Sequence, residues 1–380
     1  MTLIPVARPR LPSAQAILPY LEQIDRAAWY SNHGPLAEQF QARLSQHWGL
    51  AEQEVALLTN ATQALTLTLL ASGARVGSRC LMPSWTFIAS AGAVMAAGLV
   101  PHFVDVRPST WTPDPADILS IARREDVGAV LVVSPFGAPI DLAAWDAVQS
   151  MIGVPVIIDG AAAFDTLRAG GPMPAGWCPV IVSLHATKVF GIGEGGALLC
   201  QDPVVMERVR RLAQFGFYGT REALLPGVNA KLSEYAAAVG LAGLDGWGET
   251  RSRWATVTRH YLEALPGKTG HVPQFGADWV SSTLSVLCPA GLADPAAAMD
   301  ARGVCTLKWW GAGCHAQPAF RNCPSELLPV TTMFASRTIG LPFWQDLPQS
   351  AVERTSLALQ QCYPTLTPLH SRRRMATATG

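Results

Sequence analysis

The chain has 380 residues, of which 49% are hydrophobic and 15% are charged. This composition is typical of a folded protein and excludes a largely disordered one, and the length suits two domains. The 28 Lys and Arg residues balance the 28 Asp and Glu residues, so the charge gives no reason to expect nucleic acid or an anionic membrane as a partner.

The first 30 residues predict a short arm followed by a helix. Pro5 interrupts the opening residues before an apolar segment can form, so we expect no signal peptide. A turn at 31–35 with the sequence Ser-Asn-His-Gly-Pro precedes an amphipathic helix at about 36–48.

From residue 55 onward, short apolar runs alternate with helical stretches. The runs that predict buried parallel strands are residues 55–58, 129–133 and 155–158. The stretches that predict helices are residues 61–72, 87–97 and 142–151. This alternation predicts an α/β fold with a mostly parallel mixed sheet flanked by helices in a large domain.

Residues 80–104 contain no Asp, Glu, Lys or Arg, so a membrane span is an alternative for this stretch. Pro83, Pro101 and His102 interrupt it and argue against a span. We therefore expect a buried helix between two strands, and no membrane partner.

The pattern changes near residue 233, because residues 233–265 predict one or two long helices. The chain is then expected to have an N-terminal arm and helix, a large domain, a smaller C-terminal α/β domain and a tail, at 1–30, 31–245, 246–370 and 371–380. The tail is expected to be frayed, although its three consecutive arginines leave a basic arm for nucleic acid as the alternative.

The eight cysteines form no C-x-x-C pair, and no two histidines have the spacing of a zinc site. Several cysteines follow apolar residues, as Cys200 does. We expect reduced, mostly buried thiols in a cytoplasmic protein, and no metal site.

An acid and a lysine follow two successive predicted strands. Asp159 comes directly after residues 155–158, and Lys188 comes after an apolar run at 181–184. Such residues meet at the ligand-binding edge of an open α/β sheet. The pair suits pyridoxal phosphate (PLP), because the lysine forms an imine and the acid keeps the pyridine nitrogen protonated. Taken alone, Asp159 reads as a cap or turn residue and Lys188 as a solvated one.

The sequence at 191–196 matches G-x-G-x-x-G, but a predicted strand at 197–200 follows it where a dinucleotide site needs a helix. We therefore expect these glycines to form a tight turn beside a cofactor.

Residues 60–65 lie between a strand and a helix. The backbone amides there, with the Thr62 hydroxyl, would bind the phosphate of a cofactor, and a simple helix cap is the alternative. Trp85 follows a strand at 80–82 and would either stack on a pyridine ring or belong to the core.

These motifs together resemble the DegT-type nucleotide-sugar aminotransferases, which are PLP enzymes of the aspartate-aminotransferase (type I) fold. The most specific matches are residues 183–188, 194–196 and 227–234, and the others are residues 31–36, 60–65, 83–87, 101–106 and 158–164. The resemblance covers about residues 4–352. It is strongest to the branch that makes 4-amino-4,6-dideoxy sugars on dTDP.

The resemblance implies a role for each matching residue. Lys188 would bind PLP as a Schiff base and shuttle protons, Asp159 would pair with the pyridine nitrogen, and Trp85 would stack on the ring. The phosphate would be held by Ala61, Thr62 and Ser183, and by Asn229 from the partner subunit of a homodimer with shared active sites. The candidates for the sugar-nucleotide site are Ser31, Asn32, His185, Glu194, Trp310 and His315.

The expected reaction moves an amino group from an amino acid, L-glutamate by the resemblance, to a keto-deoxy-sugar nucleotide such as dTDP-4-keto-6-deoxyhexose. Two positions depart from the family pattern. Ala162 stands where Gln or His is usual near the ring hydroxyl of PLP, and Ala61 stands where Gly is usual. The second departure predicts a negative φ at Ala61.

Three alternatives stay open. A 3-keto-sugar aminotransferase would share these motifs. A PLP-dependent sugar dehydratase would share the fold, but the resemblance implies His in place of Lys188. A non-catalytic regulatory relative is disfavoured by the presence of Lys188, Asp159 and the expected phosphate-binding residues at 60–62.

Overall fold

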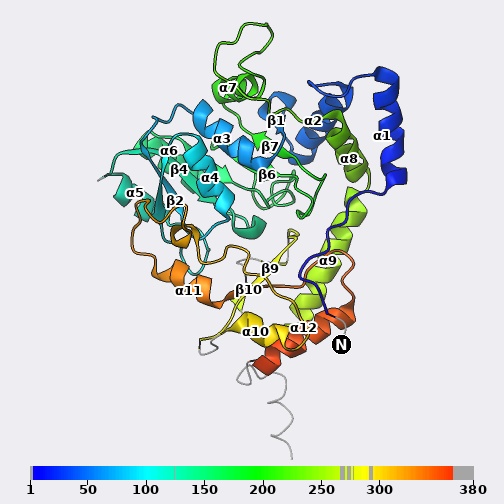
Figure 1. The fold of residues 1–380 in the computed structure, drawn as a ribbon, viewed down its shortest axis with the longest axis vertical. Coiled ribbons are helices and arrows are strands. Elements are labelled where there is room, and N and C mark those ends of the chain that lie inside the picture. Colours follow the sequence, from blue (N-terminus) through cyan, green and yellow to red (C-terminus); the bar gives the residue numbers. More distant parts are fainter. Residues whose placement is uncertain are drawn as a thin grey trace, which may run out of the picture.

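The computed structural model of the chain describes residues 3–123, 125–265, 270–271, 275–276, 278–290 and 294–362 (Figure 1). The predicted tail at 371–380, with its basic-arm alternative, lies outside the described residues. A body built on a seven-stranded sheet stands above a lower part built on a three-stranded sheet in the view of Figure 1.

The larger sheet has the strand order β1-β7-β6-β5-β4-β2-β3. Its strands are β1 (Val55–Leu58), β2 (Arg79–Pro83), β3 (Val100–Val104), β4 (Val127–Val133), β5 (Val156–Asp159), β6 (Val180–Ser183) and β7 (Gly196–Leu199). The strands from β6 to β3 pair in parallel, whereas β7 runs antiparallel to both of its neighbours. The predicted mostly parallel mixed sheet is therefore confirmed.

The predicted strand at 55–58 forms and runs in the same direction as the parallel strands, but its hydrogen-bonded neighbour is the antiparallel strand β7. β1 pairs with β7 in antiparallel register, with Val55 opposite Leu199 and Leu58 opposite Gly196. β7 enters the sheet between β1 and β6 and runs against both. All four β1 residues are buried, and a fully apolar run carries no signal for the direction of its neighbour.

The strands are buried on both faces, which explains their continuous apolar sequences. Within β4, Val130 and Val132 belong to one core, and Ala129 and Leu131 belong to the other. The first core also contains residues from α2 (Pro35–Trp48), α5 (Pro115–Ala122), α6 (Leu142–Ile152) and α8 (Glu234–Asp245). The second contains residues from α3 (Ala61–Ala71), α4 (Ile88–Ala96) and α7 (Pro203–Ala213). The helices predicted at 36–48, 61–72, 87–97 and 142–151 are confirmed.

Residues 80–104 form a strand, a helix and a strand, as predicted, because α4 lies between β2 and β3. In the described part of the chain, no helix is long and apolar enough to cross a membrane. All eight cysteines lie in that part, and five of them are buried.

Side chains fix where helices begin. The Oδ1 atom of Asn60 accepts a hydrogen bond from the N–H of Gln63 at 2.8 Å and so caps α3. A cap of this kind contributes about 1 kcal/mol. Glu234 caps α2 from α8, because its two carboxylate oxygens accept hydrogen bonds from the N–H groups of Leu36 and Ala37 at 2.8 and 3.0 Å.

The predicted helical stretch at 233–265 is two helices, α8 and α9 (Trp247–Ala264), which meet at Gly246. The helix predicted within the first 30 residues is α1 (Ala14–Ala27), which packs on α8. The lower part contains β8 (Gly270–His271), β9 (Leu284–Leu287), α10 (Pro295–Asp300), α11 (Pro329–Arg337), β10 (Thr338–Leu341) and α12 (Gln349–Cys362). The predicted domain boundaries stay a prediction.

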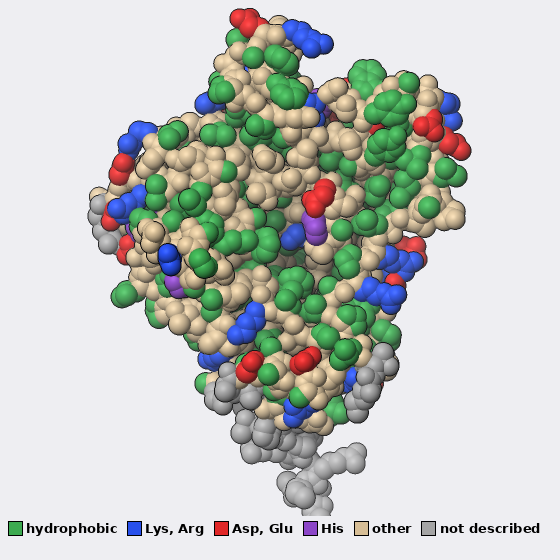
Figure 2. All heavy atoms as spheres, in the orientation of Figure 1, with side chains coloured by type: hydrophobic (Ala, Val, Ile, Leu, Met, Phe, Trp, Pro, Cys, Tyr) green, Lys and Arg blue, Asp and Glu red, His purple; other side chains and the backbone are tan. Residues whose placement is uncertain are grey.

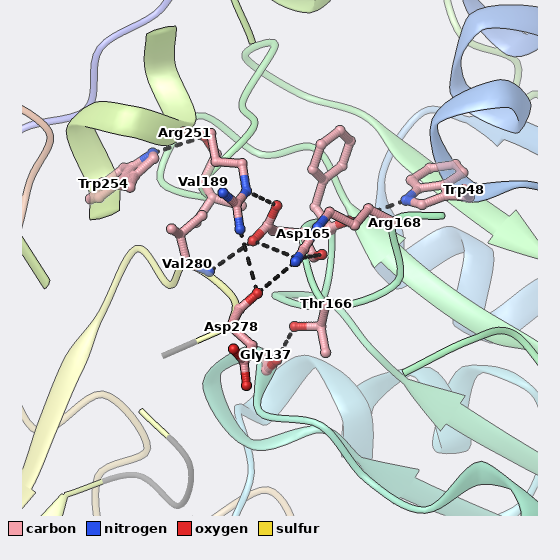
Figure 3. Close-up of polar contacts among 11 residues, drawn as sticks. Trp48, Gly137, Asp165, Thr166, Arg168, Val189, Arg251, Trp254, Asp278 and Val280 are labelled. Carbon is pink, nitrogen blue, oxygen red and sulfur yellow. Dashed lines mark hydrogen bonds and ion pairs between the residues drawn. The ribbon is translucent and has the colours of Figure 1, made fainter. Parts of the chain in front are cut away.

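An ion cluster around the buried carboxylate of Asp165 joins the body to α9 and to the segment before β9 (Figure 3). The carboxylate of Asp165 accepts hydrogen bonds from Arg251 Nε, Arg168 Nη1 and the N–H of Val280, at 2.8, 3.1 and 2.8 Å. Arg168 also donates to the carbonyl oxygen of Asp278 at 2.6 Å. The two arginines therefore share one carboxylate and hold both parts of the chain against it.

Candidate active site

The strand register brings the predicted cofactor residues to one edge of the sheet. Asp159 ends β5 and lies opposite Ile181 of β6, while Ser183 ends β6 opposite Gly196 of β7. Gly196 in turn lies opposite Leu58, the last residue of β1. The end of β5, the end of β6 and the start of α3 after β1 therefore meet at this edge, where open α/β sheets bind ligands.

Asp159 is the buried acid of this edge. Its side chain is 6% exposed, its Oδ1 accepts from the N–H of Ala161 at 3.1 Å, and its Oδ2 accepts from Ser90 Oγ at 2.6 Å. Burial raises the pKa of Asp159, whereas the hydrogen bonds from Ser90 and Ala161 and the charge of Lys188 lower it. A carboxylate so placed can hold a proton on a partner nitrogen.

Lys188 lies on the turn after β6, where its N–H donates to the carbonyl oxygen of His185 at 2.9 Å. Gly191 lets the chain fold back there, because a Cβ at this position would lie 2.8 Å from the Cα atom and the carbonyl oxygen of Ala186. Protein atoms around the ammonium desolvate it and lower the pKa of Lys188, while Asp159 opposes that shift. A lysine with a lowered pKa is a better nucleophile and proton carrier.

The start of α3 offers an anion site. Within the described residues, the N–H groups of Ala61 and Thr62 have no hydrogen-bond partner, and Thr62 is exposed. Gly196 permits the close approach of β7, because a Cβ there would lie 2.5 Å from the Asn60 carbonyl carbon and 2.6 Å from the Ala61 nitrogen. Ala61 has no positive φ, as expected. Free amides at a helix start favour a phosphate group.

An acid, a lysine and a helix start with open amides at one sheet edge fit PLP, because each part of the cofactor would meet a matching group. The residues that would hold it are Lys188, Asp159, Ala61, Thr62 and Ser183. Residues 13–360 match the family described as the DegT/DnrJ/EryC1/StrS aminotransferase family.

The chain belongs to this aminotransferase family. It is 30% identical over 371 residues to protein Rv3402c of Mycobacterium tuberculosis, covering 94% of this chain and 90% of the relative. It is 27% identical over 368 residues to dTDP-4-amino-4,6-dideoxy-D-glucose transaminase of Escherichia coli, covering 94% of this chain and 98% of the relative.

Two solved structures share the fold over nearly the whole chain. One is a protein from Bacillus cereus ATCC 10987 provisionally assigned as a PLP-dependent aminotransferase, with a TM-score of 0.88, 29% identity and coverage of 94% of this chain and 100% of that chain. The other is DesI, solved in the presence of its TDP-sugar product, with a TM-score of 0.83, 29% identity and coverage of 95% and 93%. The DegT-family aminotransferase described here therefore has the type I fold of PLP-dependent transferases.

Trp85 is packed inside an aromatic cluster that consists of Trp85, Trp111, Phe136, Trp310 and Phe334. The side chain of Trp85 is 2% exposed, and the ring of Trp310 meets it edge-on with centroids 5.4 Å apart. Trp310 also stacks on Phe136 with centroids 4.2 Å apart. Core packing therefore describes Trp85 in this structure, and its stacking on a cofactor stays a prediction.

His315 joins the same neighbourhood. Its ring Nδ1 lies 2.7 Å from Ser84 Oγ, and its backbone N–H donates a hydrogen bond to the same oxygen at 3.1 Å. Ser84 precedes Trp85 in the chain, so the structure brings Trp310 and His315 together beside Trp85.

His185 and Glu194 lie on the loop that carries Lys188. The His185 Nε2 and Glu194 Oε1 atoms are 3.6 Å apart, and more than two fifths of each side chain is exposed.

On the face shown in Figure 2, the surface is hollowed near its centre, between the body and the lower part. Two cavities of about 480 and 390 Å³ lie elsewhere and are lined by none of the predicted site residues.

The structure does not bring Ser31 and Asn32 into contact with the lysine or the acid through any interaction among the described residues. Both are exposed, and Asn32 has a φ of 64° at the turn before α2. Asn229 is exposed too, and its Oδ1 accepts a hydrogen bond from Lys231 Nζ at 2.7 Å. The carbonyl oxygen of its neighbour Ala230 accepts a hydrogen bond from the N–H of Thr59 at 2.9 Å, so this segment runs beside the start of α3 in its own chain.

Ala162, the position that departs from the family pattern, places its carbonyl oxygen against Gly137. A Cβ at Gly137, whose φ is 89°, would lie 2.4 Å from that oxygen. The Ala162 side chain offers no hydrogen bond to a cofactor.

The residues that sequence reasoning misses are Thr86 and Ser90. Ser90 contacts Asp159 and Thr86 contacts Ser90. The available signal is two hydroxyl residues four positions apart at the start of an otherwise apolar helical stretch.

Proposed function

We propose that this protein is a PLP-dependent aminotransferase that moves an amino group from an amino acid to a keto-deoxy-sugar nucleotide. The observation that carries the proposal is the placement of buried Asp159 and of Lys188 after neighbouring strands at one sheet edge, beside the open amides of α3. When bound, PLP supplies an electron sink and carries the amino group between the two substrates.

The residues of the chain divide the work. Lys188 would bind the cofactor covalently and move protons on the substrate carbon, since its lowered pKa favours both tasks. Asp159 would hold the proton on the ring nitrogen, and the amides of Ala61 and Thr62 with the Ser183 hydroxyl would hold the phosphate. Trp85 would face the ring.

The proposed sugar substrate is a dTDP-4-keto-6-deoxyhexose, for surface-polysaccharide or unusual-sugar biosynthesis. It is supported by the names of the Escherichia coli relative and of DesI with its TDP-sugar product. The proposed donor is L-glutamate, from the family resemblance alone. The proposed residues around the sugar nucleotide are Ser31, Asn32, His185, Glu194, Trp310 and His315.

The proposed assembly is a cytoplasmic homodimer whose sites are shared through Asn229.

A 3-keto-sugar substrate remains the second candidate. It is favoured by dTDP-3-amino-3,4,6-trideoxy-alpha-D-glucose transaminase of Streptomyces venezuelae, a relative that is 30% identical over 340 residues. The dehydratase alternative is disfavoured by Lys188.

A two-step assay tests the proposal. PLP-loaded protein is mixed with L-glutamate, and the 2-oxoglutarate released is measured. The protein is then freed of both and offered 4-keto and 3-keto dTDP-sugars separately while the amino-sugar products are measured. Borohydride-treated and digested protein should carry the cofactor mass on the Lys188 peptide. Lys188→Arg keeps the charge but cannot replace the lysine as nucleophile. This variant should therefore show neither the transamination products nor the cofactor mass on that peptide. Cofactor on another lysine would reassign the site, and no PLP binding would favour the regulatory alternative.

A further inference from the structure

Three buried polar side chains form a chain that ends on Asp159. Ser90 Oγ lies 2.6 Å from Asp159 Oδ2, and Thr86 Oγ1 lies 2.9 Å from Ser90 Oγ. The exposed fractions of Thr86, Ser90 and Asp159 are 2%, 0% and 6%. Water does not reach these hydroxyl groups, so their hydrogen bonds are made within the protein.

The proton positions follow from the acceptors. The ionised Asp159 can only accept, so the one hydroxyl proton of Ser90 points to Oδ2. Ser90 then has lone pairs but no proton left for Thr86, and the Thr86 hydroxyl must donate to Ser90. The two hydroxyls therefore act in sequence, and each bond polarises the next.

The backbone fixes this geometry. Ser90 lies in the first turn of α4, and its N–H donates to the carbonyl oxygen of Phe87 at 3.1 Å. Because Ser90 touches the carboxylate, the positive end of α4 lies on the same side of Asp159 and favours its charge. The Ala161 N–H binds the other oxygen at 3.1 Å, which leaves acceptor positions of the carboxylate free for a ligand.

We propose that Ser90, supported by Thr86, is a positioning residue that keeps Asp159 ionised and aimed at the ring nitrogen of PLP. The inference rests on the proposed function, because it assigns a task to Asp159 that only a bound pyridine ring gives it. Burial raises the pKa of Asp159, and the groups that oppose this are Ser90, Ala161 and the charged Lys188. Without the Ser90 hydroxyl, the carboxylate loses a charge-assisted hydrogen bond in a site where it is hard to replace.

The consequence is readable in the colour of the loaded protein. An Asp159 that is less fully ionised stabilises less positive charge on the pyridine ring. A less positive ring lets the nitrogen that joins Lys188 to PLP keep its proton to higher pH. A pH titration of the visible absorbance band follows this nitrogen directly. A residue that only filled space would not move it.

The experiment compares Ser90→Ala, Thr86→Val and Ser45→Ala in PLP-loaded protein. Ser45 is a matched control, a buried helical serine (1% exposed) whose hydroxyl donates to Gln41 and Ala42 of its own helix. We expect Ser90→Ala to raise the midpoint of the absorbance titration by about 0.5–1 pH unit and to lower kcat about 10-fold with an unchanged KM for the sugar. Thr86→Val should shift the midpoint the same way by less, and Ser45→Ala should match the wild type.

The two ideas fail in different ways. If the wild type binds no PLP at Lys188, the proposed function fails and the role of Ser90 falls with it. If the wild type binds PLP and transaminates but Ser90→Ala and Thr86→Val both titrate like the wild type, the function stands and the positioning role is overturned. Should Ser90→Ala fail to fold, the Thr86→Val titration decides alone.

Discussion

The carboxylate of Asp165 accepts a hydrogen bond from the Nε atom of Arg251, which lies on α9, at 2.8 Å (Figure 3). The Asp165 side chain has no exposed surface, whereas that of Arg251 is 33% exposed. One buried carboxylate thus fixes where α9 crosses the body, and it does so a few residues after the strand that carries Asp159.

Asp165→Asn is expected to lower the free energy of unfolding by about 2–3 kcal/mol, because it leaves Arg168 and Arg251 without their shared anion. The two arginines reach water, so the cost should stay below that of a fully buried broken pair. Denaturant unfolding measures it. Asp278→Asn is the matched control, since Asp278 contributes its backbone oxygen to the cluster. Equal stability of the two variants would contradict the role of the carboxylate.

His47 is expected to make the fold less stable in acid. Its ring stacks on Phe164 with centroids 4.6 Å apart, and burial lowers its pKa from 6.5 to about 4. A group with a lower pKa in the folded state contributes its stability above pH 6.5 and loses it as the pH falls toward 4. Between pH 7.5 and pH 5 this one group should lower the free energy of unfolding by about 2 kcal/mol.

His47→Phe keeps a ring in the stack and removes the titration. The free energy of unfolding of the wild type and of the variant is measured at pH 5, 6 and 7.5. As the pH falls, the wild type should lose more of this free energy than the variant does. Parallel pH profiles would mean that His47 titrates normally in the folded protein. The comparison cancels the other histidines, of which His33, His102 and His315 also have lowered pKa values.

Much of the body can be predicted from sequence, because strands buried on both faces give apolar runs and surface helices give periodic ones. The meeting of Asp159 and Lys188 follows from the rule that residues after parallel strands share an edge. The antiparallel direction of β7 does not follow, since a run of four buried residues fits either direction. The contacts of Ser90 and Asp165 do not follow either, because they depend on which side chains face each other after packing.

Asp159→Asn is expected to lower kcat by about 1,000-fold while PLP still binds. The amide cannot hold a proton on the ring nitrogen as a carboxylate does, but the phosphate site at α3 is untouched. Rates and bound PLP, measured on the same sample, check this. A variant that loses PLP yet keeps its rate in excess PLP would make Asp159 a structural residue.

Gly196→Ala is expected to weaken PLP binding at least about 10-fold. The added Cβ would lie 2.5 Å from the carbonyl carbon of Asn60, and a backbone atom cannot give way as a flexible side chain can. The start of α3 would have to move away from Ser183. Gly92→Ala on α4 is the control, because nothing lies within 4 Å of its added Cβ. Titration with PLP, followed by absorbance, measures the affinity of each variant. Equal affinities would contradict the placement of the phosphate site at the start of α3.

Asn229 is expected to act across a dimer interface. Its side chain is exposed and bonds only Lys231 among the described residues, so the amide lies on a surface that a second subunit can reach. Most homodimers are two-fold symmetric, and such an interface places two Asn229 segments reciprocally. The alternative is that Asn229 acts within its own chain, because the neighbouring Ala230 accepts a hydrogen bond from Thr59, just before α3 of the same chain.

Mixing two inactive variants separates these possibilities. Lys188→Ala and Asn229→Ala should each be nearly inactive as homodimers. If Asn229 works in trans, a mixed dimer has one doubly damaged site and one native site, and an equal mixture should recover roughly a quarter of the wild-type activity. If it works in cis, every site in the mixture keeps one defect and no activity returns. Mass spectrometry of the intact dimers confirms subunit exchange, so that a lack of recovery assigns Asn229 to its own chain.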